Sequence, residues 1–304
     1  MEKKRNILVS GSHRSGTTWT GKILANDKSV DYIDEPFNLN HNKIIDTPVV
    51  HWYEYVSEND SKDRIKQFEK YLDKNLKFNL RNYFLDIKKS KTLRQFAKFN
   101  YIYLKKIAKP RKLIKDPIAL MSAGWLAKKY DLDVLLLVRH PAAFVASLKV
   151  KDWKFDYFNF ANQPLLIKEK LQKFETQINY FVENPNQDII KQGILLWNII
   201  YDVVHEYQKK YPNWYVITHE KLSSNPLMEY EKIFKHFNLD FSDKVKSNIL
   251  NSSDGESGKD SKLKRDSKSN ITSWKNRLSA QEIDLIKEGT KEISDLFYTQ
   301  ADWE

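Results

Sequence analysis

The residues best suited to chemistry lie near the start of the chain, between Ile7 and Trp19. Three aliphatic residues predict a short buried strand, and a turn with glycines at Gly11 and Gly16 separates it from a helix predicted to begin at Thr17. Glycines let backbone N–H groups approach a ligand, and the N-terminus of a helix adds partial positive charge. This pattern favours an anion-binding loop over an ordinary strand–turn–helix corner.

The loop nearly matches the nucleotide-binding pattern G-x-x-x-x-G-K-[ST], in which the lysine grips the β- and γ-phosphates. Gly11, Gly16 and Thr18 fit the pattern, but Thr17 stands where the lysine belongs. The nearest cation is Arg14, inside the loop itself. We therefore expect the loop to hold an anion other than a magnesium-bound triphosphate.

Three further charged residues, Glu35, Lys115 and Arg139, lie at the ends of segments that predict strands. The apolar run 134–138, just before Arg139, is typical of a parallel strand buried on both faces. Strands that alternate with helices predict a parallel sheet covered on both sides. Ligands bind at the carboxyl edge of such a sheet, so we expect these three side chains and Arg14 to lie near one rim.

These motifs together resemble a known family. The motif Ser-x-x-Arg-Ser-Gly-Thr-Thr-Trp, which ends at Trp19, resembles the 5′-phosphosulfate loop of sulfotransferases that use 3′-phosphoadenosine 5′-phosphosulfate (PAPS). Asp-Glu-Pro at 34–36 and Lys-Asp-Pro at 115–117 are similar to segments of the Golgi-type, bacterial and tyrosylprotein members. The spacing Arg139-x-Pro-x-x-x-x-x-Ser147 resembles their 3′-phosphate motif.

The resemblance implies an enzyme that moves a sulfonate group from PAPS to a hydroxyl acceptor. It implies a P-loop-like α/β fold of three layers, with a central parallel sheet flanked by helices and a helical insertion. Glu35 would be the general base, and Arg14 and Lys115 would neutralise charge on the departing phosphate. Trp19 would either stack on adenine or pack in the core. The donor-binding residues so implied are Arg14, Ser15, Gly16, Thr17, Thr18, Trp19, Arg139 and Ser147.

Two departures from the cytosolic small-molecule members of this family refine the expectation. Those enzymes use a histidine base soon after a lysine on the third strand, whereas an Asp-Pro pair follows Lys115 here, which favours Glu35 as the base. A local surface ion pair with Asp116 is the alternative reading of Lys115. The C-terminal Arg-Lys-Gly of the cytosolic enzymes is also absent, and we expect Arg265, beside Lys264, to take its place on the 3′-phosphate.

The chain of 304 residues is expected to form a single domain over 1–304. Residues 38–110 predict a helical, aromatic insertion at the sheet edge, and a solvated face is favoured over a binding surface for its lysines. Residues 151–187 predict irregular structure, and residues 251–270, rich in Ser, Gly and Lys, predict a mobile loop. The predicted strands are 7–9, 30–33, 113–117 with Pro117 closing it, 134–138 and 214–218.

Composition limits the setting of this activity. The net charge of +11 favours anionic ligands, and the absence of cysteine excludes disulfides and zinc–thiolate sites. No apolar run is long enough for a signal peptide or a membrane span, so a cytoplasmic enzyme is expected. No metal site is expected, because no two histidines share metal-ligand spacing on one helix and a sulfonyl group carries less charge than a phosphoryl group.

The acceptor stays open at this stage. Aromatic, basic segments at 51–110 and 151–187 would suit a saccharide or an acidic ligand, and we favour a carbohydrate or lipid-linked glycan hydroxyl. A protein tyrosine or a small molecule is the alternative acceptor. The rival functions are a P-loop kinase that uses ATP and magnesium, and a basic module that binds nucleic acid, which would leave the position of Glu35 unexplained. The sequence does not define an oligomeric state.

Overall fold

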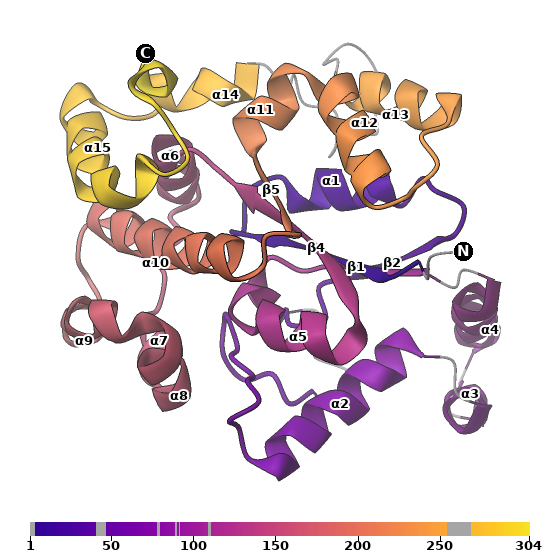
Figure 1. The fold of residues 1–304 in the computed structure, drawn as a ribbon. Helices are drawn as coiled ribbons and strands as arrows, with labels where there is room; N and C mark the ends of the chain where they lie inside the picture. The colour runs from indigo at the N-terminus through magenta and orange to yellow at the C-terminus, as the bar shows by residue number, and fades with distance from the viewer. Residues whose placement is uncertain are drawn as a thin grey trace.

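The structure, a computed structural model, describes residues 4–40, 47–77, 80–88, 90, 92–108, 111–253 and 269–304. Within these residues, five parallel strands form one central sheet in the order β2-β3-β1-β4-β5 (Figure 1). All five predicted strands are confirmed, and so is the α/β fold class. The strands are β1 (Asn6–Gly11), β2 (Val30–Asp34), β3 (Arg111–Lys115), β4 (Leu132–Val138) and β5 (Tyr215–Thr218).

Helices cover both faces of the sheet, as a fully buried parallel sheet requires. Alternate residues of β4 point to opposite sides: Leu136 belongs to one buried cluster and Leu137 to the other. One face packs against α2 (Lys62–Leu76), α5 (Ala123–Tyr130), α6 (Pro141–Lys151) and α10 (Ile189–Lys210). The other face packs against α1 (Thr17–Leu24), α11 (His219–Ser224), α12 (Pro226–His236) and α13 (Asp243–Ser253) (Figure 1).

The insertion is helical, as predicted. Its first helix, α2, joins the core, where Phe68 stacks on Phe37 with the ring centroids 5.9 Å apart. The next two helices, α3 (Leu80–Lys88) and α4 (Leu93–Ala108), pack against each other at the outer edge of the molecule (Figure 1). Together with the core helices they complete the predicted three layers and insertion.

The segment predicted to be irregular, 151–187, is built from short helical pieces. Its apolar residues do not keep one helical period long enough to predict a helix, because each piece is short. The pieces are α7 (Phe158–Ala161), α8 (Pro164–Leu166), a π turn (Ile167–Leu171), a 3₁₀ turn (Gln172–Phe174) and α9 (Glu175–Glu183). The mobile loop expected at 251–270 falls mostly on residues 254–268, outside the described residues.

Helix ends follow the chemistry of their sequence. Ser279 and Glu282 form a capping box that opens α15 (Ala280–Ser294), which packs on α6 and α10. Pro141 occupies the first turn of α6. The remaining helical pieces are a 3₁₀ turn before α5 (Ile118–Ser122), α14 (Ser269–Thr272), Ser273–Asn276 and Gln300–Trp303. No helix in the described part of the chain combines the length and apolar character needed to cross a membrane.

Candidate functional site

The predicted anion loop connects β1 to α1 and is shaped by its backbone. At Gly11, φ is +146° and an added Cβ would lie 2.4 Å from the carbonyl oxygen of Leu137, so this position requires glycine for β1 to pair with β4. Gly16 has φ +93°, and Arg14 adopts the left-handed region with φ +68°. Within the described residues no side chain caps the start of α1, so its first N–H groups suit an anion.

The loop is held directly against the predicted 3′-phosphate motif. Arg14 Nε donates to Ser147 Oγ at 3.0 Å, and a guanidinium Nη1 of Arg139 donates to the carbonyl oxygen of Arg14. Arg14 lies in the loop after β1, whereas Arg139 follows β4 and Ser147 lies on α6, 125 and 133 positions away from Arg14 in sequence. The sequence predicted that Arg14 and Arg139 share a rim, and the structure brings them into contact.

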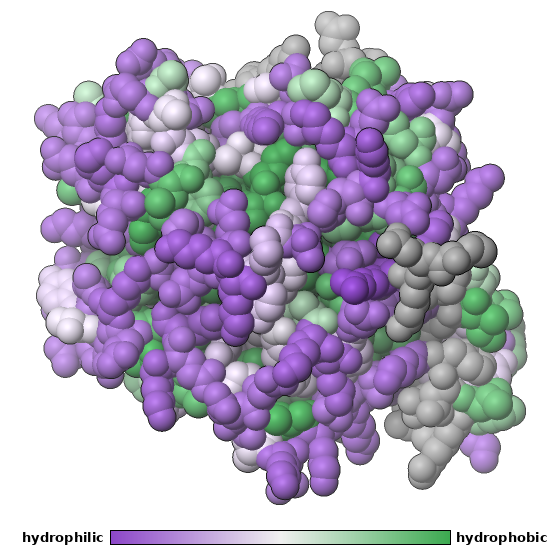
Figure 2. All heavy atoms as spheres, in the orientation of Figure 1, coloured by the Kyte–Doolittle hydropathy of each residue, from purple (hydrophilic) through white to green (hydrophobic). Residues whose placement is uncertain are grey.

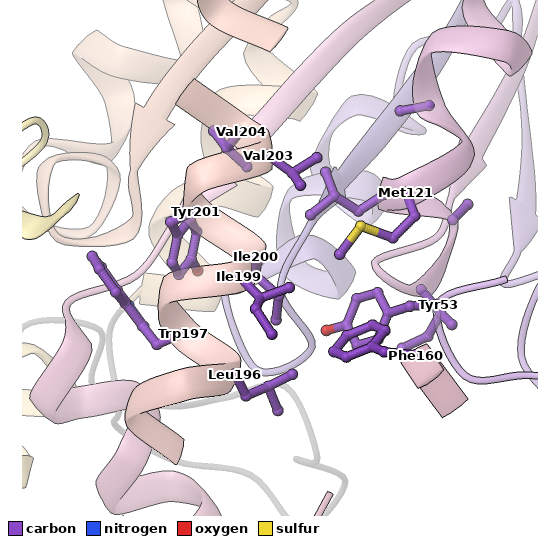
Figure 3. Close-up of a cluster of buried hydrophobic side chains, with 14 of the residues drawn as sticks. Tyr53, Met121, Phe160, Leu196, Trp197, Ile199, Ile200, Tyr201, Val203 and Val204 are labelled. Atoms are coloured by element: carbon purple, nitrogen blue, oxygen red, sulfur yellow. The ribbon is translucent and has the colours of Figure 1, made fainter. Parts of the chain in front are cut away.

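One residue that the sequence did not single out connects these two segments. The hydroxyl of Tyr201, on α10, accepts the backbone N–H of Arg139 at 2.9 Å and lies 2.7 Å from Ser12 Oγ in the loop. Trp197, which lies one turn earlier on α10 (Figure 3), donates to the carbonyl oxygen of Arg139 at 2.8 Å. The apolar spacing of this helix predicts both rings as core, and no signal in the sequence shows which strand end their polar atoms reach.

The guanidinium of Arg139 is partly buried and incompletely bonded. Among the described residues, its Nε has no hydrogen-bond partner although it is buried. Burial lowers the pKa of Arg139, and the nearby carboxylate of Glu220 opposes that shift. Glu220 is itself buried, and it accepts the hydroxyl of Tyr298 at 2.7 Å. A buried N–H without a partner is costly unless a ligand accepts it, which fits a phosphate site at Arg139.

Glu35 and Lys115 form a second cluster at the ends of β2 and β3. The Glu35 backbone has φ +44°, a left-handed conformation that is rare for residues other than glycine, and its N–H donates to the carbonyl oxygen of Lys115 at 2.9 Å. Its carboxylate forms an ion pair with Lys115 Nζ and accepts the side-chain amide of Asn38. Asp34 also pairs with Lys115 Nζ, at 2.6 Å.

Asp116 holds the turn that carries this cluster. Its Oδ2 accepts the N–H of Phe37 at 2.6 Å, and its Oδ1 accepts the N–H groups of Ile118 and Ala119 at 2.9 and 3.1 Å. Burial raises the pKa of Asp116 to about 7. The alternative of a surface ion pair between Lys115 and Asp116 is wrong, because both side chains are buried and the lysine pairs with Glu35 and Asp34 instead.

The sheet order relates the two clusters. β1 lies between β3 and β4, so the loop sits between the Lys115 end and the Arg139 end of the sheet. Helix α1, which the loop starts, packs on the lysine stem: a Cβ on Gly21 would lie 2.9 Å from Lys115 Cγ. All four charged residues predicted for one rim therefore lie at carboxyl strand ends around one loop.

A cavity of about 160 Å³ lies beside the loop at His13. Burial lowers the pKa of His13 to about 3, and the charge of Arg14 adds to this shift. The neutral ring places Nδ1 2.7 Å from the hydroxyl of Tyr53, and Trp52 and Trp153 form an aromatic wall, with their ring centroids 6.5 Å apart. The sequence pointed to the aromatic segments but not to His13, whose position next to Arg14 was the available signal.

One of the expected donor residues, Trp19, contacts other side chains of the protein. Trp19 is half-buried, meets Tyr230 edge-to-face at 5.2 Å, and donates from Nε1 to Ser252 Oγ at 2.9 Å. Arg265, with Lys264 and Lys268, lies outside the described residues. Among the residues that the structure does describe, no group of three or more His, Asp or Glu side chains is gathered so that it could hold a metal ion.

The parallel sheet and its glycine-bounded anion loop define a P-loop-like α/β protein. A model of the sulfotransferase domain matches residues 4–296, so the chain belongs to the sulfotransferase family and is a PAPS-dependent sulfotransferase. The family resemblance read from the four motifs is thereby confirmed.

Solved structures agree on the fold. The sulfotransferase domain from the curacin biosynthetic pathway has a TM-score of 0.52 and 17% identity over 97% of this chain and 98% of its own. The sulfotransferase domain from the Synechococcus PCC 7002 olefin synthase has a TM-score of 0.50 and 15% identity over 98% of both chains. A comparison with curated proteins found no match.

Proposed function

We propose that this enzyme sulfonates a saccharide hydroxyl, with Glu35 as general base and with the donor held between the loop and Arg139. The contact between the loop and the 3′-phosphate motif carries the proposal, because Arg14, Ser147 and Arg139 converge there from three elements. PAPS, when bound, supplies the sulfonyl group and a phosphate as leaving group. The single domain over 1–304 is part of the same proposal.

The donor-binding roles follow from which groups can donate to phosphate. The loop offers the backbone N–H groups of residues 16–18 and the hydroxyl of Thr18, which is exposed at the start of α1. Arg139 offers a guanidinium with an unsatisfied Nε, and Ser147 offers a hydroxyl already oriented by Arg14. Fixed donors of this kind hold a reactant in line without reorganising during the reaction.

Glu35 is suited to take a proton because its conformation is fixed. The left-handed turn at Glu35, tied to Asp116 through Phe37, sets where the carboxylate points. Lys115 binds the same carboxylate and can turn its charge toward a departing phosphate. The general base and the group that stabilises the leaving phosphate therefore lie side by side. These groups supply proton transfer and charge neutralisation without a metal, and we propose a metal-free reaction.

The cavity beside His13 supports a saccharide acceptor. Sugars bind on aromatic rings with a few polar groups at the edges, and this cavity combines Trp52 and Trp153 with Asp156 and Asn159. It adjoins the loop through His13, so an acceptor seated there lies next to the donor site. A cytoplasmic setting is proposed as well, since a chain without cysteine needs no oxidising compartment.

Adenosine 3′,5′-bisphosphate (PAP) alone is expected to stabilise the protein, without magnesium. A ligand that binds only the native state at a hundredfold excess over its Kd adds ~2.7 kcal/mol to the free energy of unfolding. Thermal unfolding is measured with PAP, and with ATP in the presence and absence of magnesium. Stabilisation by magnesium-ATP and none by PAP would overturn the donor proposal and favour a kinase.

Trp153→Ala is expected to raise the KM for a saccharide acceptor by about tenfold and leave the KM for PAPS unchanged, because it removes a stacking surface. The ring is 39% exposed, so the core keeps its packing. The matched control is Phe158→Ala, whose ring is also exposed but does not line the cavity. Equal acceptor KM values in the two variants would place the acceptor elsewhere.

A further inference from the structure

Helix α4 presents an apolar stripe to solvent. Leu93, Phe96, Leu104 and Ile107 are 88%, 46%, 66% and 59% exposed. Their spacing of 3, 11 and 14 residues from Leu93 places all four on one face, because a helix repeats every 3.6 residues. Large hydrophobic side chains gathered on an exposed face mark an interaction site, whereas scattered ones do not.

Helix α4 packs on α3 along one border of this stripe. Tyr103, which lies beside Phe96 on the helix surface, is 4% exposed and meets Tyr83 of α3 edge-to-face at 5.1 Å. Helix α3 adds two exposed residues one turn apart, Leu80 and Phe84. Figure 2 shows hydrophobic residues at this edge of the molecule, beside the helices labelled α3 and α4 in Figure 1. We call α3 and α4 together the hairpin.

The hairpin and the residues that join its helices also carry most of the protein's net positive charge. In sequence, residues 80–108 carry eight Lys and Arg and one Asp, a net charge of +7 out of +11 for the whole chain. Lys88, Arg94 and Lys98 are exposed, and the last two lie on the side of α4 away from the apolar stripe. The expectation of a merely solvated basic face therefore does not account for the leucines and phenylalanines that accompany the lysines.

We propose that the hairpin binds the surface of an anionic lipid bilayer, with the apolar stripe in the headgroup region and the cations of the polar side on lipid phosphates. A helix that pairs an apolar face with Lys and Arg is the form that lies in a membrane interface. This binding is peripheral, and it is independent of the sulfonate transfer proposed above. It would bring the enzyme to acceptors that are themselves anchored in lipid.

Two other occupants fit the hairpin less well. A second copy of the same surface would bring two strongly positive segments together, and like charges repel. Nucleic acid would satisfy the charge, but it is bound by cations and stacking aromatic rings, whereas Leu93, Leu104 and Ile107 are aliphatic. A bilayer satisfies both the charge and the aliphatic residues.

The first experiment is flotation with vesicles of phosphatidylcholine alone or with phosphatidylglycerol. The wild-type protein is expected to float with the anionic vesicles and to dissociate as salt is raised. Leu93→Ser/Leu104→Ser is expected to lower the partition coefficient by about tenfold or more. The matched control, Leu285→Ser/Leu296→Ser, removes two exposed leucines outside the hairpin and is expected to bind as wild type.

The second experiment reverses two charges in each of two variants, which therefore have the same net charge as each other. Arg94→Glu/Lys98→Glu is compared with Lys235→Glu/Lys244→Glu, which reverses two exposed lysines on other helices. Each cation near the lipid surface contributes about a fivefold change in partition, so the hairpin variant should lose at least tenfold more binding than its control. Thermal unfolding with and without PAP confirms that all four variants fold and keep the donor site.

Several outcomes would overturn the proposal: no flotation of the wild type, equal loss in hairpin and control variants, or equal binding to neutral and anionic vesicles. Release from vesicles by an oligonucleotide that itself binds more tightly would assign the hairpin to nucleic acid. Oligomers that dissociate in the leucine variant would assign it to self-association. If PAP does not stabilise the protein but vesicle binding is intact, the proposal for the donor site is wrong and the proposal for the hairpin stands.

Discussion

Glu35→Gln is expected to lower kcat by a factor of about 10²–10⁴ while the Kd for PAP stays within a few-fold of wild type. The amide keeps the size of the side chain but cannot accept a proton from the acceptor, and general base catalysis contributes effects of this size. The buried ammonium of Lys115 keeps Asp34 as a partner at 2.6 Å, so the fold and the donor site should survive. Turnover is measured with PAPS and a panel of saccharides, and PAP binding by calorimetry.

The chain offers a matched control one residue away. Asp34→Asn removes a carboxylate from the same strand end and from the same lysine, but the Asp34 side chain is 50% exposed and extends β2 rather than turning at its end. We expect Asp34→Asn to keep turnover within about tenfold, since a partly exposed ion pair contributes ~0–1 kcal/mol. The reverse pattern, with Asp34→Asn inactive and Glu35→Gln active, would make Asp34 the base.

Sequence periodicity was sufficient to predict the strands of the sheet. The aliphatic run 134–138 could only be a strand buried on both faces, and β4 is buried in that way at the centre of the sheet. The rule that parallel strands end at one edge then placed Arg14, Glu35, Lys115 and Arg139 on one rim. These predictions succeeded because each rests on local residue types plus one topological rule.

The contacts between distant segments could not be predicted in the same way. Tyr201 reaches both Ser12 and Arg139, 189 and 62 residues away, because the register of α10 against the sheet puts its hydroxyl there. The carboxylate of Asp116 accepts backbone N–H groups from two separate turns, a role that depends on how those turns close. Single-sequence patterns fix faces and periods, whereas such contacts depend on the exact packing of elements.

Electrostatic pairing within the site was also outside the reach of the sequence. The sequence left a local pair with Asp116 as the alternative for Lys115, but in the structure Lys115 turns toward β2 and pairs with Glu35 and Asp34. Neighbouring strands in a parallel sheet come from distant parts of the chain, so the spatial neighbour of Lys115 is 80 residues away in sequence. The pairing also means that PAPS must compete with Glu35 for Lys115, and that the acceptor hydroxyl must compete with Lys115 for Glu35.

Arg139→Ala is expected to raise the Kd for PAP by about 10–100-fold, because a hydrogen bond to a charged group contributes ~1.5–3 kcal/mol. This loss of affinity should depend on the 3′-phosphate of the ligand. Adenosine 5′-monophosphate lacks that phosphate, so its affinity should change little and the preference for PAP over it should largely disappear. Arg139→Lys keeps the charge but lacks the planar guanidinium, so its Kd for PAP should lie between those of the wild type and Arg139→Ala. Arg277→Ala, which removes an exposed arginine, is the control.

Removing Arg139 also leaves the buried Glu220 without the nearby positive charge that favours its ionised form. A general loss of stability could therefore imitate a loss of phosphate binding. The double variant Arg139→Ala/Glu220→Gln separates the two effects, because it removes both charges together and keeps an oxygen to accept the hydroxyl of Tyr298. If the double variant regains stability but still does not distinguish PAP from the 5′-monophosphate, Arg139 binds the 3′-phosphate. If it regains the preference for PAP, Arg139 acts through Glu220, and the 3′-phosphate is held elsewhere.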